Sequence, residues 1–565
     1  MIEFPPGLIL ILGALLVPFL RGPLRAIWML ALPVAAFAVL FSLPEGDHFA
    51  ISAFGQQLEL LRVDGLSKVF GYVFLVAIFL GVIYALHVRA VEEHVSGLVY
   101  AGAAIGAVFA GDLVTLFVYW ELTAISSVFL ILTRRTPEAL AASMRYLIIQ
   151  VGSGVLLLAG LIVIWHETGS IAFDHIGIES AGGVLILLAF GIKAAFPLLH
   201  NWLQDAYPQS TPTGTVLLSA FTTKLAIYAL ARGYAGTEEL IWIGAIMTVF
   251  PIFFAVIEND LRRVLVYSLN NQLGFMVVGV GIGTELALNG AAAHAVTHIL
   301  YKALLFMSIG AVLHRTGTAL ASELGGLFKS MPVTAVFCAI GSASIAAVPL
   351  FSGFVSKSMI LSAAAHEGLY GVWLTMLFAS AGVLVYSGIK VPYFAFFAED
   401  SGKRPQEAPM NMLVAMALAA ALCIGIGVWP SALFAILPFD VDYVPYTDSH
   451  VLSQVQLLVF SVLAFVVLLR SGLYPKQLRS INLDTDWFYL RLGRSFLQFA
   501  TRAAENMHSD AYDLVVRRAK RFVEQLYRHH GPHGIIARTW PTGSMVLWVA
   551  ILLVTYLALY FIDIF

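Results

Sequence analysis

The chain has 565 residues, of which 60% are hydrophobic and only 12% are charged, and its mean hydropathy is +0.87. Soluble domains are about 45–50% apolar and about 25% charged, so the composition excludes a water-soluble enzyme, a disordered protein and a secreted scaffold. A formal net charge of -2 offers no basic surface for nucleic acid. The two cysteines, Cys338 and Cys423, lie in apolar runs and provide neither a disulfide framework nor a cysteine metal site. The sequence therefore predicts an integral membrane protein.

Apolar runs long enough to cross a bilayer follow one another almost without pause from Pro5 to Leu469. A transmembrane helix needs about 20 such residues, and on this basis we expect an all-α membrane fold with about 14 to 16 transmembrane helices. The first run lacks the charged leader and cleavage site of a signal peptide and is expected to be a retained span. The predicted spans are Gly7–Leu20, Ala26–Leu43, Leu66–Val88, Gly97–Ala110, Leu113–Thr133, Leu140–Ile164, Gly183–Trp202, Val216–Ala231, Leu240–Ile257, Val264–Ile282, Leu286–His314, Val333–Leu350 with a continuation to Ala364, Val372–Phe397, Met412–Trp429, Leu452–Leu469 and Ser544–Phe561.

Positively charged residues beside the short loops predict the orientation, because positive loops stay in the cytoplasm. Eleven such residues accompany loops after odd-numbered spans: Arg21, Arg25, Arg89, Arg134, Arg135, Arg262, Arg263, Arg315, Lys329, Lys403 and Arg404. Three accompany the other loops: Arg62, Lys68 and Arg232. The bias predicts an N-terminus outside the cytoplasm of a bacterial cell.

Six segments are predicted along the chain. They are the N-terminal helices (residues 1–95), a first five-helix repeat (96–235), a second five-helix repeat (236–400), the C-terminal helices (401–471), a cytoplasmic amphipathic segment (472–540) and a final span (541–565). In the amphipathic segment, arginines alternate with aromatic and aliphatic residues, which is typical of helices on a membrane surface or against a partner. A solvated linker that returns the chain to its last span is the alternative.

Ionisable residues inside the predicted spans are the main functional signal. Each costs roughly 2.5–3.5 kcal/mol at the bilayer centre, so such residues usually face the protein interior or a water-filled path. The candidates are one acid and five lysines: Glu121, Lys193, Lys224, Lys302, Lys357 and Lys390. The alternative is that the long side chains reach out to the interface, which we expect for at least one of Lys357 and Lys390.

The eleventh span carries a row of three polar residues, two histidines and one of these lysines. His294, His298 and Lys302 stand at i, i+4 and i+8, so they line one helix face over about 12 Å. Histidine changes charge near neutral pH, and such a row could pass protons. A pair of hydrogen-bonded core histidines is the alternative. The spacing also resembles part of a zinc site, but no further ligand completes it, and we predict neither a metal nor a cofactor.

Two spans are predicted to be interrupted by proline. The seventh contains Ala-Ala-Phe-Pro-Leu around Pro197, and the twelfth contains Ala-Ala-Val-Pro-Leu around Pro349. A proline inside a helix removes a backbone hydrogen bond and clashes with the preceding turn. The breaks lie five spans apart, which pairs the fourth to eighth spans with the ninth to thirteenth as inverted repeats. Broken helices at matching positions of inverted repeats indicate an ion path near the bilayer midplane.

Three stretches with these residues resemble a known family. They are GIKAAFPLLHNWLQDAYPQSTPTGTVLLSAFTTK at Gly191–Lys224, DLRRVLVYSLNNQLGFMVVG at Asp260–Gly279 and HAVTHILYKALLFMSIGAV at His294–Val312. They are similar to the antiporter-like subunits of respiratory complex I and of Mrp-type multisubunit cation/proton antiporters. The resemblance covers roughly Leu60–Glu399 and is greatest to the D-type component of the Mrp antiporters. The chain departs from the family core by its amphipathic segment and final span.

The resemblance implies a role for each buried charge. Glu121 would be the acid of the fifth helix, and Lys193 would be its partner on the broken seventh helix. The path would continue through Lys224 on the eighth helix and end at Lys357 on the broken twelfth helix. The residues that bridge the two repeats would be His294, His298 and Lys302. Lys390 is a further candidate from its position alone. The expected partners are other membrane subunits, the lipid bilayer, protons and possible Na⁺ or K⁺ counter-ions.

We therefore predict an ion-translocating subunit of an Mrp-type monovalent cation/proton antiporter. Acidic ligands inside the spans are few, namely Glu121 with Asp112 at the head of its helix, and this favours a proton path over a sodium cage. Asp112 and Asp205 are predicted to be helix-end or loop carboxylates. The alternatives are a proton-pumping subunit of a quinone oxidoreductase or membrane-bound hydrogenase, a non-conducting structural module, and a self-sufficient transporter of a small solute. The sequence contains no motif for a redox cofactor, so redox chemistry would belong to partners.

Overall fold

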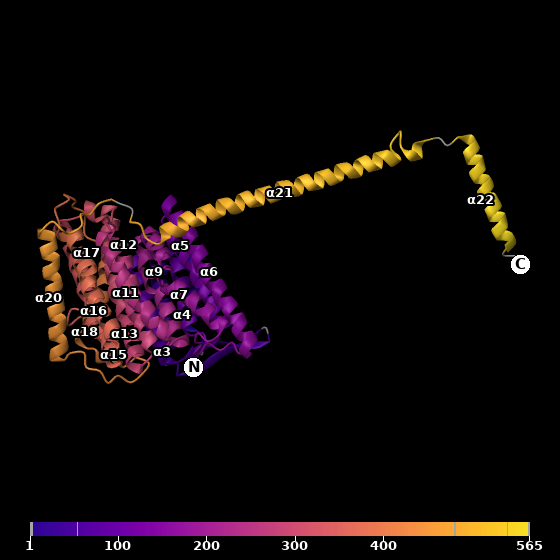
Figure 1. Cartoon of the computed structure of the whole chain (residues 1–565). Helices are drawn as coiled ribbons and strands as arrows, with labels where there is room; N and C mark the ends of the chain where they lie inside the picture. The colour runs from indigo at the N-terminus through magenta and orange to yellow at the C-terminus, as the bar shows by residue number, and fades with distance from the viewer. Residues whose placement is uncertain (1–3, 54, 480–481, 539–540, 563–565) are drawn as a thin grey trace. The chain divides into compact units, whose positions relative to one another are not determined.

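The computed structural model describes residues 4–53, 55–479, 482–538 and 541–562. The chain forms two compact units, one up to Asp484 and one from Thr485 onward. In the first unit, long helices pack side by side with roughly parallel axes, and α20 lies at one edge of the bundle (Figure 1). Within the described residues, twelve helices are long and apolar enough to cross a membrane. The predicted helical membrane fold is confirmed.

The remaining four of the sixteen predicted spans are shorter or less apolar helices. They correspond to α1, α4, the pair α7 and α8, and the pair α14 and α15. In α4 the first turn carries Glu92 and Glu93, which lower its hydropathy, and in the two pairs a break divides the span. The difference from the predicted number therefore comes from how the spans are built and not from missing segments.

The N-terminal part contains three helices and a β-hairpin that the sequence analysis did not predict. The strands β1 and β2 pair antiparallel, with Gly46 opposite Val63 and Ala53 opposite Gln56. Backbone bonds from Arg62 N to Phe109 O and from Gly111 N to Glu59 O, both 2.8 Å, tie β2 to the connection before α5. The elements are α1 (Pro6–Ala14), η1 (Val17–Phe19), α2 (Gly22–Ser42), β1 (Gly46–Ala53), β2 (Gln56–Val63) and α3 (Gly65–Ala85).

The next helices correspond to the predicted first repeat. They are α4 (Val91–Val108), α5 (Leu113–Leu132), α6 (Pro137–Thr168), α7 (Ala181–Ala194), α8 (Asn201–Ala206), η2 (Tyr207–Gln209), α9 (Pro212–Ala220) and α10 (Thr222–Gly233). As predicted, the seventh span is broken around Pro197. The eighth span is also broken, at Phe221 between α9 and α10, without a proline or glycine at that position.

The helices of the predicted second repeat follow. They are α11 (Glu238–Ile257), α12 (Leu261–Ile282), α13 (Glu285–Thr316), η3 (Ala321–Glu323), η4 (Leu327–Lys329), α14 (Pro332–Ile345), α15 (Ser352–His366), α16 (Tyr370–Val383), η5 (Leu384–Ile389), α17 (Lys390–Pro392) and η6 (Tyr393–Phe397). The twelfth span is broken around Pro349, as predicted. Turns of π-helix, η5 and η6, flank Lys390.

The breaks in the two repeats have the same backbone geometry. Ala195 and Leu198 have φ values of 61° and 70°, and Ala347 and Leu350 at the corresponding positions have 57° and 73°. Such left-handed conformations cost about 1–2 kcal/mol for residues other than glycine.

A second pair of features also matches between the repeats. An isolated β-bridge joins Asp112 to Ala172 in the first, and another joins Asp260 to Leu320 in the second. Asp112 and Asp260 each cap the helix that follows with a side-chain oxygen. The prediction for Asp112 as a helix-end carboxylate is confirmed.

The chain continues with α18 (Met410–Val428), α19 (Ser431–Phe434) and α20 (Asp448–Arg470), and the second unit contains α21 (Asp486–His530), η7 (Ile535–Ala537) and α22 (Thr542–Ile562). The helix α21 is 45 residues long, or about 67 Å at 1.5 Å per residue. Several apolar side chains on it are exposed within the chain, among them Phe496 and Phe522. Its predicted place on a membrane surface stays a prediction.

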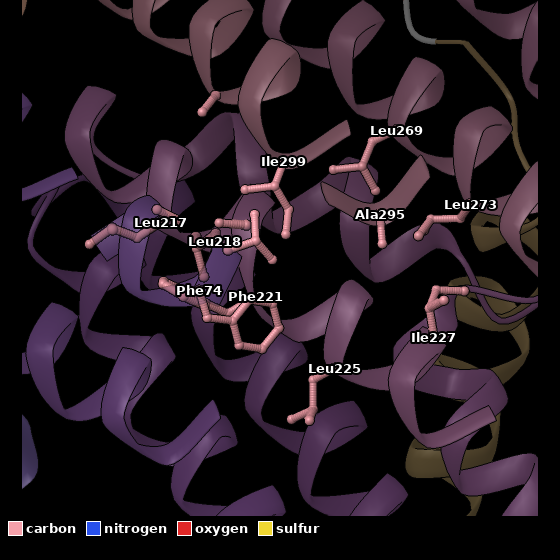
Figure 2. Close-up of a cluster of buried hydrophobic side chains, with 14 of the residues drawn as sticks. Phe74, Leu217, Leu218, Phe221, Leu225, Ile227, Leu269, Leu273, Ala295 and Ile299 are labelled. Carbon is pink, nitrogen blue, oxygen red and sulfur yellow. The ribbon is translucent and has the colours of Figure 1, made fainter. Parts of the chain in front are cut away.

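Buried apolar side chains fill the space where the two repeats meet. Figure 2 shows one such cluster, which includes Phe221 at the break, Leu225 of α10, Leu269 of α12 and Ile299 of α13. The ring of Phe221 packs edge-on against Phe74 with centroids 5.2 Å apart. The break in the eighth span is therefore set into a close-packed apolar core, and polar groups near it need partners inside the protein.

Candidate ion-translocation site

The first group of candidate residues lies between α5, α6 and α7. Lys193 is buried in the last turn of α7, and its Nζ donates to Trp120 O at 2.6 Å and to Thr123 Oγ1 at 2.9 Å. The ammonium also lies 4.2 Å from the centroid of the Trp120 ring, a cation–π contact. Glu121 interacts electrostatically with Lys193, but within the described residues no direct salt bridge joins them.

A glycine on α6 makes room for the carboxyl group of Glu121. A Cβ atom at Gly154 would overlap Glu121 Oε1. Glu121 is half-buried, and its Oε1 is buried without a partner in the described part of the chain. Buried polar atoms are almost always hydrogen-bonded to protein or water, so this oxygen is available to a proton or a water molecule.

The second group begins at the break in the eighth span. Lys224 is buried, and its Nζ donates to Ser219 O at 2.6 Å and to Thr223 Oγ1 at 3.2 Å. Ser219 lies in the last turn of α9, where the break at Phe221 interrupts the regular helical bonding of carbonyl groups. The lysine therefore satisfies a backbone acceptor that the break exposes.

The predicted row on α13 is buried and continues from Lys224. The rings of His294 and His298 have centroids 6.1 Å apart, and Lys302 Nζ donates to Ser268 Oγ on α12. His298 has both ring nitrogens buried without a partner among the described residues. Lys224 interacts electrostatically with all three residues of the row. The alternative of a pair of hydrogen-bonded core histidines is met by His294 alone, whose Nδ1 has a partner in Ser356 Oγ.

Lys357 on α15 closes this row at the second proline break. Its Nζ donates to Ile345 O, at the end of α14, at 3.0 Å, and to Ser380 Oγ at 3.4 Å. The neighbouring Ser356 hydroxyl lies 3.0 Å from His294 Nδ1. The buried lysines at the eighth-span break and the twelfth-span break, Lys224 and Lys357, thus both interact electrostatically with the histidines of α13.

Lys390 occupies a different place. It donates to three carbonyl oxygens at the C-terminus of α11, those of Ala255 at 3.0 Å, Val256 at 2.8 Å and Glu258 at 2.6 Å. Lysines near a helix C-terminus commonly bind its last carbonyl groups. Lys357 and Lys390 are only 2% and 0% exposed, so the expectation that one of them reaches the interface is wrong. Their hydrogen bonds to backbone acceptors replace the hydration that the interface would provide.

The five buried lysines differ in the number of hydrogen bonds that their side chains donate. An ammonium has three N–H donors and a neutral amine has two. Lys193, Lys224 and Lys357 each donate two hydrogen bonds, and Lys302 donates one. These four can lose a proton and keep every bond. Lys390 donates three, so losing a proton would break one of its bonds, and its geometry fits a charged helix cap.

The structure therefore brings most of the predicted residues together in two groups. One group is Glu121 with Lys193, and the other runs from Lys224 along the row on α13 to Lys357. Within the described residues, no direct hydrogen bond or ion pair connects one group to the other. Sequence reasoning missed the hydroxyl partners of the lysines, which are Thr123, Thr223, Ser268 and Ser380. The available signal was the presence of hydroxyl residues inside strongly apolar spans.

Asp205, predicted to be a loop or helix-end carboxylate, lies in the short helix α8. It pairs with Arg145 through two hydrogen bonds of 2.6 Å and 2.8 Å. This bidentate pair fixes α8 to α6, so Asp205 serves the packing of the broken seventh span.

These features define a polytopic membrane protein with two proline-broken spans and buried ionisable groups beside the breaks. The family model for the transmembrane region of NADH:quinone oxidoreductases and Mrp antiporters matches residues 110–384. Residues 110–384 of the chain thus form the membrane domain that this family of antiporter-like proteins shares.

Individual relatives agree with this assignment. The chain is 32% identical over 403 residues to the A/B-type component of a probable K(+)/H(+) antiporter of Rhizobium meliloti, covering 66% of this chain and 40% of the relative. It is 27% identical over 432 residues to the D-type component of the Na(+)/H(+) antiporter of Bacillus subtilis, covering 70% of this chain and 87% of the relative. The chain thus spans less than half of the A/B-type relative and most of the D-type relative.

A solved structure shows the same fold. A chain of the Mrp complex from Dietzia sp. superposes with a TM-score of 0.77 at 23% identity, covering 99% of this chain and 62% of that chain. The coverage extends over nearly all of this chain, so the shared fold is not confined to residues 110–384.

Proposed function

We propose that this chain is the ion-translocating D-type component of a multisubunit Mrp-type monovalent cation/proton antiporter, and that it moves protons along its buried file of ionisable groups. The observation that carries the proposal is a series of buried ionisable groups, Lys224, His298, His294 and Lys357, that lie between two helix breaks and interact electrostatically. Each lysine in it can change charge without losing a hydrogen bond. The relatives named as components of K(+)/H(+) and Na(+)/H(+) antiporters support the same assignment.

Electrostatic repulsion gives the series a way to move charge. Two unit charges at the 6.1 Å separation of the His294 and His298 rings repel by about 3 kcal/mol at an effective dielectric constant near 20. This is about five times the thermal energy at 25 °C, so the pair holds one proton far more readily than two. A proton that arrives from Lys224 therefore displaces one toward Lys357, and occupancy moves along the series in steps.

The proposal includes partners and orientation. We infer that the chain works among other membrane subunits in a bacterial cytoplasmic membrane, with its N-terminus outside the cytoplasm, as the loop charges predict. Exchange of a monovalent cation for protons would then use surfaces that these partners share with the chain.

Two substitutions test the proposal in the assembled complex. Glu121→Gln removes an ionisable oxygen at nearly constant shape, and Lys193→Ala removes the ammonium that interacts with it. Cation-driven pH change in inverted membrane vesicles is the measurement, and copurification of partner subunits reports assembly. Surface substitutions Glu138→Gln and Lys329→Ala are the matched controls, since Glu138 is exposed and Lys329 is 49% exposed.

We expect both core variants to lose most cation-driven proton movement while the controls keep it. Wild-type transport in assembled Glu121→Gln and Lys193→Ala complexes would refute the path. Proton movement that is driven by electron transfer to a quinone or by the formation or oxidation of hydrogen, and not by a cation gradient, would instead assign the chain to a redox-driven pump.

A further inference from the structure

The break in the twelfth span leaves two carbonyl groups at the end of α14 without their regular backbone donors. In a continuous helix, Ile345 O would accept from residue 349 and Ala346 O from residue 350. Residue 349 is Pro349, which has no N–H group. The N–H group of Leu350 donates elsewhere, to Tyr446 Oη at 3.2 Å. Both carbonyl groups therefore depend on side-chain donors.

Two side chains from different helices supply these donors. Lys357 Nζ on α15 donates to Ile345 O at 3.0 Å, and Gln454 Nε2 donates to Ala346 O at 3.3 Å. Gln454 lies in the second turn of α20 and is only 8% exposed. The last lysine of the series and a residue of α20 thus bind adjacent carbonyl groups of the same helix end.

The residues that reach the break from α20 form a row at positions 446, 450 and 454, four residues apart. Tyr446 stands two residues before the helix begins, and besides accepting from Leu350 it donates to Gly427 O on α18. The ring of His450 stacks on Phe354 of α15, with centroids 4.4 Å apart and planes inclined by 19°. We call the row Tyr446, His450 and Gln454 the α20 clamp.

Most of α20 makes no comparable contact. Its three buried residues are Gln454, Ser461 and Phe465. Ser461 donates to a carbonyl group of its own helix, and Phe465 packs against the ring of Tyr393 in η6. A buried amide costs free energy unless it is hydrogen-bonded. The bond from Gln454 to Ala346 O therefore fixes where this end of α20 sits on the bundle.

We propose that the α20 clamp holds the twelfth span open at its break, and that Gln454 is thereby a positioning residue for Lys357. The inference rests on the proposed function, in which Lys357 ends the series. With the clamp in place, Ala346 O and the N–H group of Leu350 each have a partner on the α20 segment, so they do not bond to each other. Without Gln454, Ala346 O is a free acceptor, and the Lys357 ammonium can turn toward it and away from Ser380.

Two substitutions of Gln454 separate positioning from packing. Gln454→Met keeps the approximate size of the side chain and removes the donor at every pH. Gln454→Glu keeps the shape, and the carboxyl group that it introduces can donate to Ala346 O when protonated but not when ionised. Gln456, two positions along α20, is exposed, so Gln456→Met and Gln456→Glu are the matched controls. The readout is cation-driven proton movement by the assembled complex in vesicles, measured from acid to alkaline pH.

We expect Gln454→Met to slow proton movement by about threefold to tenfold at every pH, the range that loss of one hydrogen bond gives. Gln454→Glu should approach the wild-type rate in acid. At alkaline pH it should be at least as slow as Gln454→Met, because the ionised group has no donor and attracts the Lys357 ammonium. Both controls should keep the wild-type rate throughout.

Each rate is compared with that of the wild type at the same pH. The titratable groups beside this position, among them Tyr446, His450 and Lys357, are present in both proteins, so their own titration cancels in the ratio. Loss of packing alone would give a defect that does not depend on pH. The pH dependence of Gln454→Glu therefore reports the hydrogen bond itself.

Assembled Gln454→Met and Gln454→Glu complexes that transport like the wild type would overturn the inference, and so would a defect in Gln454→Glu that is the same at every pH. If Gln454→Met does not assemble, Gln454→Glu compared between acid and alkaline pH decides the question. The variants Glu121→Gln and Lys193→Ala separate this result from failure of the proposed function. If they abolish transport while the Gln454 variants do not, the path stands without the clamp. If none of the four affects transport, the proposed function fails as well.

Discussion

Replacing Gly154 by alanine moves the carboxyl group of Glu121 without changing any ionisable residue. The added Cβ would lie 2.5 Å from Glu121 Cδ and would overlap Oε1. Non-bonded carbon atoms settle at about 3.5–4.0 Å, so the carboxyl group must move by about 1 Å or more. Because it is the end of a flexible side chain, this movement is possible without unfolding the helix pair.

The expected effect is on transport and not on stability. Glycine to alanine in a helix gains about 0.5–1 kcal/mol from backbone entropy alone. Misplacement of a reacting group by about 1 Å can lower a reaction rate by a factor of about 100. For Gly154→Ala we therefore expect the rate of cation-driven proton movement to fall by a factor of about 10 or more.

Gly152→Ala provides the control on the same helix, since nothing lies within 4 Å of a Cβ at that position. Proton movement in vesicles and thermal melting of the purified complex should be measured for both variants. If Gly154→Ala assembles and transports like Gly152→Ala, the position of the Glu121 carboxyl group does not matter, and the reasoning is refuted.

Two further predictions concern stability. Lys390→Met leaves three buried carbonyl groups of α11 without their donor, and each unsatisfied group destabilises the fold by about 1–3 kcal/mol. The melting temperature of the complex should therefore fall, and Lys390→Arg should restore part of it. An unchanged melting temperature would contradict the capping role. Burial acts to raise the pKa of Asp64, but the Arg232 guanidinium and the hydrogen bonds from Ser67 outweigh it and hold that pKa below its usual range. The stabilisation from this carboxylate is present above its unfolded pKa and is lost as the pH falls through the folded value. Asp64→Asn should therefore melt lower than the wild type at pH 7, with a difference that shrinks in acid; a difference independent of pH would count against the ion pair.

The buried charges could be predicted from the sequence because a charge within an apolar run has few alternatives. The face shared by His294, His298 and Lys302 followed from helical spacing, and the breaks at Pro197 and Pro349 followed from the missing N–H of proline. These features depend on residues close together in the chain. Local reasoning was therefore sufficient for them.

Features that depend on distant segments were not predictable in this way. The capping of α11 by Lys390 joins residues more than a hundred positions apart, and the break at Phe221 has no proline or glycine to mark it. The hairpin β1–β2 is stabilised partly by bonds to the connection before α5. At least one of Lys357 and Lys390 was expected at the interface, but the backbone acceptor that Lys357 uses, Ile345 O, is free to accept because the helix breaks there.

The shared geometry of the two breaks makes each one a reference for the other. Glycine would adopt a positive φ freely, and yet alanine and leucine occupy the left-handed positions in both. A substitution made at one break therefore has a ready-made counterpart at the other, where its effect can be compared within a single molecule.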